Sequence, residues 1–492
     1  MISVYMEVPE AHRAKAQYAI RELTLRWSIA TCFVSDPREA QLHYAPAGCT
    51  SAPGSTFVRF DPRLYDETTV CVARSDAEGR RLWGCEARSD PDSEDLIGAT
   101  YRLLTYLDEA QVAATKRDQR GIFMTAALPS GRREATDIPL VECHAEALLS
   151  RVLAKNPSLR GAQIPRWPHG KRYAIALSHD VDALHLGSTL ELATNLIKGC
   201  LRGSREHLGL FGVGLRYLGR ASQNPYFAFS SWREWELEHG TRSATYLYYR
   251  PSGVRRDVND CKSGVGRGTD WNVLKSMARE GWEFGLHPSI HVAEAPEKFR
   301  EAKLWVEERL GMPIHGLRHH YWALDWLRPY VTHRKHASAG YRYDSSIAWR
   351  DQAGFRAGTA LPYRPFDPVV GEEIQLVEIP CNLMDGHALF ENGLRVDPVT
   401  AIERGRALMS RVRECGGVAT PNWHLQAAFN HSIYRDFLDV CHGVLEPFLD
   451  DSDAWIATPF EVCKRWEQLR TELGIDGSDP APYKPESLVG IS

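Results

Sequence analysis

The sequence predicts an α/β protein in which a small N-terminal α/β domain precedes a longer region of repeated β/α units. Its 492 residues are enough for two or three domains, and 43% hydrophobic with 25% charged residues is typical of a globular chain. After about residue 170, short apolar runs alternate with segments of helical periodicity. This alternation predicts parallel strands in either an open sheet or a barrel, and both bind ligands at the C-terminal ends of the strands.

Residues 1–150 predict a small α/β domain of unknown role. Segments 28–35 and 55–60 have the composition of strands, and 95–111 carries apolar residues at helical spacing. No catalytic group of residues is visible there. Residues 151–170 hold three prolines between apolar segments, which indicates a linker.

Residues 171–470 predict the repeated β/α units. The expected order is strand 173–178, helix 229–240, strand 245–249, helix 269–281, strand 282–287, helix 296–311, a short strand before Arg318, helix 399–417 and strand 418–424. Glycines near the helix ends are typical of helix C-termini. The glycine-rich stretch 201–228 is long for a connection, and an insertion over the active face is one interpretation of it. Residues 471–492 are expected to form a loose tail.

Charge and cysteine usage exclude several classes of protein. The 59 basic and 63 acidic residues give a net charge of −4 without a basic block, which argues against a nucleic-acid partner. The eleven cysteines are scattered and never form CxxC, so we expect a reducing compartment rather than a disulfide framework. Glu7 and Glu10 do not fit a signal peptide, and no stretch suits a transmembrane helix. We therefore expect a cytoplasmic protein; the sequence leaves its oligomeric state open.

Polar residues able to bind a metal or to titrate follow four of the expected strands. They are Asp180 and Asp182, His287 and His291, Arg318 with His319 and His320, and His424. Because the ends of parallel strands gather at one edge, a β/α active site would lie there.

Asp182, His287 and His291 predict a catalytic metal site. Two histidines four residues apart lie on one side of a helical turn. A carboxylate from a neighbouring strand would complete three metal ligands and leave the fourth position open for water. The alternative is one capping and one surface histidine. Asp180 and Asp182 point to one face of a strand, so a metal on Asp182 would free Asp180 to act as a base; the alternative is a loop pair that caps a helix.

The residues from Tyr173 to about Trp466 resemble the polysaccharide deacetylases of the NodB-homology type, carbohydrate esterase family 4. SHDVD, GLHPSIH, GLRHHYW and NWH are similar to four motifs of that family in the same order, over about 300 of 492 residues. GYRYDSSIAW, GFRAGTALPYRPFD and EIPCNLMD resemble a branch of bacterial homologues associated with surface-glycan synthesis. The resemblance implies a deformed (β/α) barrel.

It also implies catalytic roles. Asp180 is similar to the catalytic base, His424 to the acid, and Arg318 to the arginine that pairs with the base carboxylate and holds it ionised. Asp385, at the end of EIPCNLMD, could orient His424; the alternative is a strand-end residue that caps a loop.

The resemblance gives the metal ligands as Asp182, His287 and His291. The first motif departs from the usual adjacent aspartates because Val181 intervenes. The arginine motif normally continues with proline, but here it continues with His319, His320 and Tyr321. We expect these three to line the substrate pocket, and an additional metal ligand is the alternative.

The function implied is metal-dependent removal of an N-acetyl group from an amino sugar in a glycan precursor, with Zn²⁺ as the expected ion. One alternative keeps the same metal site and hydrolyses another amide or a cyclic imide. A second is a catalytically silent glycan-binding module.

Overall fold

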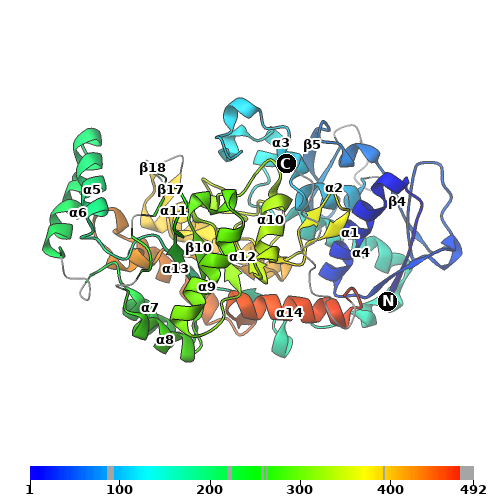
Figure 1. Ribbon diagram of the computed structural model, residues 1–492. Coiled ribbons are helices and arrows are strands. Elements are labelled where there is room, and N and C mark those ends of the chain that lie inside the picture. Colours follow the sequence, from blue (N-terminus) through cyan, green and yellow to red (C-terminus); the bar gives the residue numbers. More distant parts are fainter. Residues whose placement is uncertain are drawn as a thin grey trace.

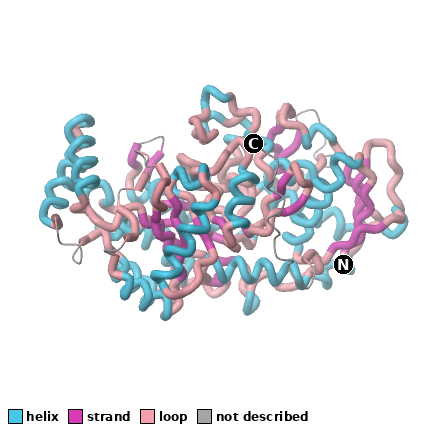
Figure 2. The backbone as a smooth tube through the Cα atoms, viewed as in Figure 1, coloured by secondary structure: helices cyan, strands magenta, loops and turns pink. Residues whose placement is uncertain are grey.

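The computed structural model describes residues 1–85, 94–218, 224–255, 257, 260–261, 263–266, 269–391 and 394–476. The molecule is elongated, with the N-terminal sheet at one end and the helices α5 (Thr189–Arg202) and α6 (Arg205–Arg216) at the other (Figure 1). Figure 2 shows the strands in two separate groups, one in each half of the molecule. Within the described ranges, no helix is long and apolar enough to cross a membrane. The tail expected from 471 on lies outside them after residue 476.

The N-terminal region is an α/β unit, as predicted. Its four-stranded parallel sheet has the order β2-β1-β3-β4. The strands are β1 (Ile2–Met6), β2 (Thr31–Val34), β3 (Leu42–Ala45) and β4 (Thr56–Arg59), followed by the hairpin of β5 (Cys71–Ser75) and β6 (Arg81–Cys85). The helices are α1 (Glu10–Trp27), α2 (Leu96–Leu104), α3 (Ser130–Arg133) and α4 (Leu140–Lys155). The elements β1, α1, β3, β5, β6, α3 and α4 were not predicted from the sequence.

An eight-stranded parallel sheet, curved as a deformed (β/α) barrel, forms the second half of the molecule and confirms the predicted fold class. Its order is β15-β12-β11-β10-β9-β8-β20-β16. These strands are β8 (Ser178–Val181), β9 (Ala244–Tyr249), β10 (Glu283–Pro288), β11 (Gly316–Leu317), β12 (Tyr343–Asp344), β15 (Val377–Glu378), β16 (Leu383–Met384) and β20 (Pro421–Asn422). Beside it β19 (Val418–Ala419), β7 (Tyr173–Ile175) and β21 (Ala454–Ile456) form a three-stranded sheet, also parallel. The small antiparallel pairs are β13 (Phe366–Asp367) with β14 (Glu372–Glu373), and β17 (Phe390–Glu391) with β18 (Leu394–Arg395).

Helices alternate with these strands because the sequence supplies both their apolar faces and their ends. The side chains of Asp270, Asp397 and Thr458 accept hydrogen bonds from the first turns of three helices. Gly311 and Gly416 each end a helix in the left-handed conformation, and Gly416 ends the helix that Asp397 begins. Besides α5 and α6, the helices are α7 (Phe229–Glu238), α8 (Trp271–Arg279), α9 (Glu297–Leu310), α10 (Pro329–Ser338), α11 (Asp385–Leu389), α12 (Pro398–Cys415), α13 (Phe437–Leu449) and α14 (Pro459–Glu472).

The two halves share packing and buried charge. One apolar cluster combines Leu104 of α2 with Trp326 and Phe366 from the second half. The guanidinium of Arg356 donates two hydrogen bonds of 2.8 Å to the buried carboxylate of Glu109. Helix α4 continues to Lys155, past the predicted start of the linker. The division into 1–150, 151–170 and 171–470 stays a prediction.

Candidate active site

Strand β8 directs alternate side chains to opposite sides of the sheet. Ser178 and Asp180 both accept a hydrogen bond from Arg318. His179 points the other way, where its ring contacts Glu236 at 2.9 Å and the carbonyl oxygen of Trp423 at 2.7 Å. His179 is therefore a packing residue, and Asp180 faces the C-terminal edge with the other strand-end residues.

The fully buried guanidinium of Arg318 holds Asp180 in place. It lies 3.1 Å from Asp180 Oδ1, donates to the backbone and side-chain oxygens of Ser345, and stacks 4.5 Å from the ring centre of Tyr246. The amide of Asn422 donates to Asp180 Oδ2 at 2.8 Å. Burial alone would raise the pKa of Asp180, but Arg318 and the neighbouring histidines hold it below its usual value, so the carboxylate is ionised.

Four potential metal donors converge beside Asp180. Asp182 Oδ1 lies 3.3 Å from His287 Nε2, 3.8 Å from His320 Nε2 and 3.3 Å from Cys261 Sγ. One donor atom from each of these four residues lies within 4.8 Å of the others. Two ligands about 2.1 Å from a tetrahedral ion are about 3.4 Å apart, so these separations suit a single ion.

The two histidine rings are oriented by their second nitrogens. His287 donates from Nδ1 to the carbonyl oxygen of Arg318 at 2.6 Å, which leaves the lone pair on Nε2. His320 Nδ1 lies 3.3 Å from a carboxylate oxygen of Asp260. The buried Nε2 of His287 has no hydrogen-bond partner among the described residues. Zinc and similar ions prefer imidazole nitrogens and carboxylate oxygens as ligands. The unpaired imidazole nitrogen next to the carboxylate therefore fits a divalent ion.

The structure does not bring His291 to this group. His291 lies in a 3₁₀ turn, Ile290–Glu294, where its Nε2 contacts Asp257 at 3.0 Å and its Nδ1 contacts Glu294 at 2.5 Å. Both ring nitrogens of His291 are engaged, and His320 is the second histidine in the group around Asp182. The alternative kept open for the residues after Arg318, an additional metal ligand, is therefore the one that the geometry favours.

His424 and Asp385 form a pair on the opposite wall. Asp385 lies 3.0 Å from His424 Nδ1 and also accepts from the backbone nitrogen of His424 at 2.9 Å. His424 Nε2 lies 3.3 Å from Asp182 Oδ2. Burial would lower the pKa of His424, but the carboxylates of Asp385 and Asp182 raise it well above its usual value. The raised pKa favours the protonated imidazole, and Asp385 fixes its orientation.

These residues open into a cavity of about 300 Å³. Its lining comprises Asp180, Asp182, His287, His319, His320, Tyr321, Trp322, Arg350, Met384 and His424. Tyr321 and Trp322 have the left-handed φ values of 61° and 52°, and Arg350 donates to the Tyr321 hydroxyl at 2.6 Å. The expected lining residues His319, His320 and Tyr321 are thus at the cavity, and Arg318 and Asp385 support it from behind.

Four contacts were not predicted from the sequence: those of Cys261, Asp260, Asn422 and Arg350. Asn422 stands within the NWH motif, so its position next to His424 was a usable signal. Cys261 and Asp260 lie in the connection between β9 and α8, where no periodicity indicates which side chains turn inward.

Comparisons with known proteins give structural similarity alone. No family model matches the sequence, and no curated protein matches it. The similar solved structures include candidate polysaccharide deacetylases from Mycobacterium smegmatis and Pseudomonas aeruginosa PAO1, with TM-scores of 0.41 and 0.40 and identities of 20% and 14%. Puue allantoinase has a TM-score of 0.41 at 14% identity. Each of the three covers 62% of this chain. The matched part is 93% of the Mycobacterium smegmatis chain, 94% of the Pseudomonas aeruginosa chain and 93% of the allantoinase chain.

Proposed function

We propose that the protein is a metal-dependent hydrolase that removes an N-acetyl group from an amino sugar in a glycan precursor. The observation that carries this proposal is the orientation of His287 and His320. His287 Nδ1 donates to the carbonyl oxygen of Arg318, His320 Nδ1 lies 3.3 Å from Asp260, and each Nε2 faces the carboxylate of Asp182. Such a carboxylate and imidazole set, with an acid and a base on either side, suits hydrolysis of an amide.

Asp182, His287 and His320 would hold the ion, for which Zn²⁺ is the best match to nitrogen and oxygen ligands. When bound, such an ion supplies Lewis acidity, which polarises a carbonyl and lowers the pKa of water. Three protein ligands leave a position open for the reaction. The Sγ of Cys261 lies 3.3 Å from the same carboxylate and belongs to the same group of donors.

Asp180 and His424 would divide the proton transfers. The ionised Asp180, fixed by Arg318 and Asn422, accepts a proton from the attacking water. The protonated His424 donates to the departing amine, which is otherwise a poor leaving group, while Asp385 keeps Nε2 directed into the cavity. Opposite pKa shifts in neighbouring groups are typical of a base and an acid that work as a pair.

The cavity supports a small polar substrate with one apolar face. Its volume of about 300 Å³ is at the small end of ligand pockets, and its wall combines Tyr321 and Trp322 with the guanidinium of Arg350. Aromatic faces beside hydrogen-bond donors suit a sugar ring that carries hydroxyl groups.

The test combines elemental analysis with acetate release from N-acetyl amino sugars, their nucleotide derivatives and cyclic imides. We expect about one equivalent of zinc at the active site, its loss in Asp182→Asn, and its retention in Asp180→Asn and His424→Asn, both of which lose turnover. Turnover of imides alone would move the function to the other amide hydrolases. A protein that takes up no ion at Asp182 after reconstitution would be a silent binding module.

A further inference from the structure

A second group of buried ligands lies away from the active-site residues. His333, on α10, meets the carboxylates of Asp344 and Glu378, which are at the ends of the neighbouring strands β12 and β15. Asp344 and Glu378 belong to the sequence segments GYRYDSSIAW and EIPCNLMD, to which the proposed mechanism gives no role at these positions. All three side chains are buried.

The donor atoms have the separations of ligands around one ion. His333 Nε2 lies 3.7 Å from Asp344 Oδ2 and 3.6 Å from Glu378 Oε2. Ligands about 2.1 Å from a tetrahedral zinc ion are about 3.4 Å apart. His333 Nε2 and Glu378 Oε2 have no hydrogen-bond partner among the described residues, although the His333 and Glu378 side chains are only 1% and 0% exposed.

The other oxygens of the two carboxylates are anchored by protein donors. Glu378 Oε1 accepts from the backbone nitrogen of Ile347 at 3.1 Å, and Asp344 accepts from the hydroxyl of Ser346. Asp344 Oδ2 also contacts His336 Nδ1 at 3.1 Å. The carboxylates are therefore held with their remaining lone pairs turned toward His333, which is how second contacts orient metal ligands.

Two buried carboxylates that face the same imidazole nitrogen repel each other when both are ionised, and a divalent cation between them would offset that repulsion. His333 also lines a cavity of about 510 Å³.

We propose that His333, Asp344 and Glu378 form a second site for a divalent transition-metal ion such as Zn²⁺. This ion fastens α10 to the ends of β12 and β15. The cluster continues to the active site, because His336 Nε2 lies 3.1 Å from Nε2 of His319, which lines the catalytic cavity. The ion is structural, since the cluster supplies three buried ligands and no catalytic group.

Zinc stoichiometry after reconstitution and dialysis tests this site separately from the active site. We expect two ions per chain in the wild type, one in Asp182→Asn, one in Glu378→Gln and none in the double variant. His144→Gln, which changes another fully buried histidine, should keep both ions. An unchanged stoichiometry in Glu378→Gln would overturn the proposal.

Anomalous diffraction at the zinc edge from wild-type crystals tests the same site without any variant. We expect a peak between His333 and Glu378. Its absence in crystals of reconstituted protein would overturn the second site. If the catalytic ion were absent and this peak remained, only the proposed function would fail.

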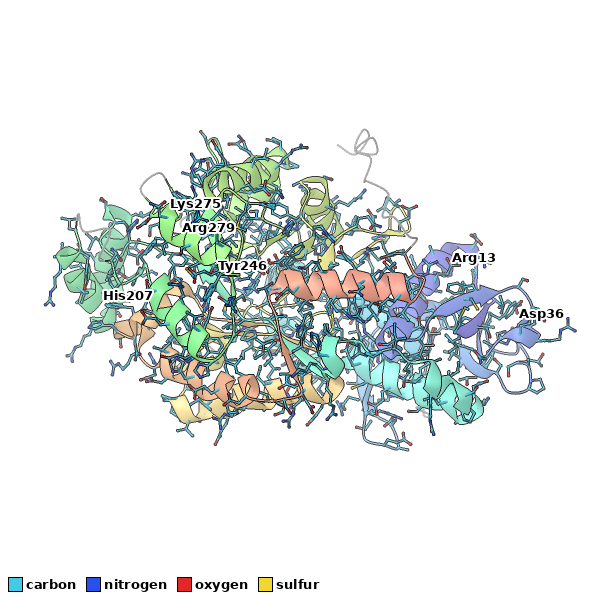
Figure 3. The ribbon with its side chains drawn as sticks, turned by 90° about the horizontal axis from the view of Figure 1, so that it is seen from below. Arg13, Asp36, His207, Tyr246, Lys275 and Arg279 are labelled. Atoms are coloured by element: carbon cyan, nitrogen blue, oxygen red, sulfur yellow. The ribbon has the colours of Figure 1, made fainter. Side chains whose placement is uncertain are left out.

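A different observation concerns the hairpin of α5 and α6. Six large apolar side chains on or next to these helices are more than a third exposed: Leu196, Ile197, Leu201, Leu208, Leu215 and Leu218. Leu201 is 81% exposed. The hairpin projects at the end of the molecule opposite the N-terminal sheet (Figure 1), and Figure 3 shows His207 of α6 at one end, Asp36 at the other and Tyr246 between them.

The hairpin carries a net positive charge, whereas the whole chain carries a net negative charge. Residues 189–218 hold four basic side chains, Lys198, Arg202, Arg205 and Arg216, and two acidic ones, Glu191 and Glu206. The local balance is thus +2, whereas the whole chain carries −4. Apolar residues flanked by arginines are typical of helices that lie in the surface of an anionic bilayer.

We infer that this hairpin docks on an anionic lipid surface. The hairpin begins at Thr189, and β8, the strand that carries Asp180, ends at Val181. This inference does not depend on the metal sites.

The test is flotation with vesicles of phosphatidylglycerol and phosphatidylcholine in equal amounts, and with phosphatidylcholine alone. We expect binding to the anionic vesicles, weakened by salt, and at least a tenfold loss in the double variant Leu201→Ser with Leu218→Ser. Leu304→Ser on α9, where the side chain is 54% exposed, is the matched control and should bind normally. Absence of vesicle binding would overturn the inference, as would a wild-type dimer that the double variant abolishes.

Discussion

Replacing His320 should cost far more metal affinity than replacing His291. We choose asparagine for both, because its amide nitrogen can replace Nδ1 of histidine as a hydrogen-bond donor and no atom replaces Nε2. His320→Asn would keep the contact with Asp260 and lose the nitrogen that faces Asp182. His291→Asn changes a side chain that hydrogen-bonds with Asp257, Glu294 and Arg255.

The size of the effect follows from the number of ligands. Loss of an outer-shell contact typically weakens metal binding about 10-fold to 100-fold. Removal of one of three direct ligands should reach at least the upper value, a 100-fold increase in Kd, which is about 2.8 kcal/mol. His291→Asn should remain within about 10-fold of the wild type.

Competition for Zn²⁺ against a chromophoric chelator measures both variants, in a Glu378→Gln background so that only one site is titrated. Thermal unfolding of each apoprotein is the control, because a loss of fold would lower affinity without any loss of a ligand. If His291→Asn lost the ion and His320→Asn kept it, the ligand assignment from the structure would be refuted, and the assignment from the sequence motif would stand.

Three further outcomes are expected. Asp385→Asn should lower the pKa of His424, because it removes one of the two carboxylates that raise this pKa. The alkaline limb of the profile of kcat against pH should therefore move to lower pH. An unmoved limb would exclude His424 as the acid. Gly316→Ala should destabilise the fold by about 1–3 kcal/mol in denaturant titration, because the added Cβ would lie 1.8 Å from the ring of Tyr343. Gly161→Ala should leave stability unchanged or raise it slightly, because the added Cβ has no atom within 4 Å. Equal unfolding midpoints for the two glycine variants would contradict the close packing of Gly316 against Tyr343. Dialysis against a chelator should abolish acetate release and added zinc should restore it, whereas activity without a bound ion would contradict a metal-dependent reaction.

The sequence was informative wherever a strand or a helix fixes the direction of a side chain. The apolar run before Asp180 predicted a strand, and β8 is present there and buried. The resemblance, and not the strand period, implied the contact of Asp180 with Arg318 that the structure contains. The helix 296–311 and the strand 245–249 are present close to their predicted ends, because their apolar spacing and the glycine at 311 are local signals.

The sequence was less informative where irregular backbone decides which residues meet. The spacing of His287 and His291 suggested one helical face, but the chain leaves β10 through Pro288 and turns as a 3₁₀ helix, so the two rings separate. His320 reaches the site just before two consecutive residues with positive φ, which no periodic pattern indicates. The helices α5 and α6 were missed because their glycines obscured the helical pattern.

Arg318 has a consequence for how this scaffold could change over time. Its guanidinium joins Ser178 and Asp180 of β8, Tyr246 of β9 and Ser345 after β12 while fully buried, so the same group tunes the base and ties the strands together. Removing it would leave the Asp180 carboxylate buried without its cation, at a typical cost of about 3–5 kcal/mol. A related protein that had lost its activity would therefore still need this arginine for a stable fold. An arginine at this position in a relative is evidence that the fold is kept, and it is not evidence of activity. His424 and His320 line the cavity and do not join strands, so they are the better indicators of activity.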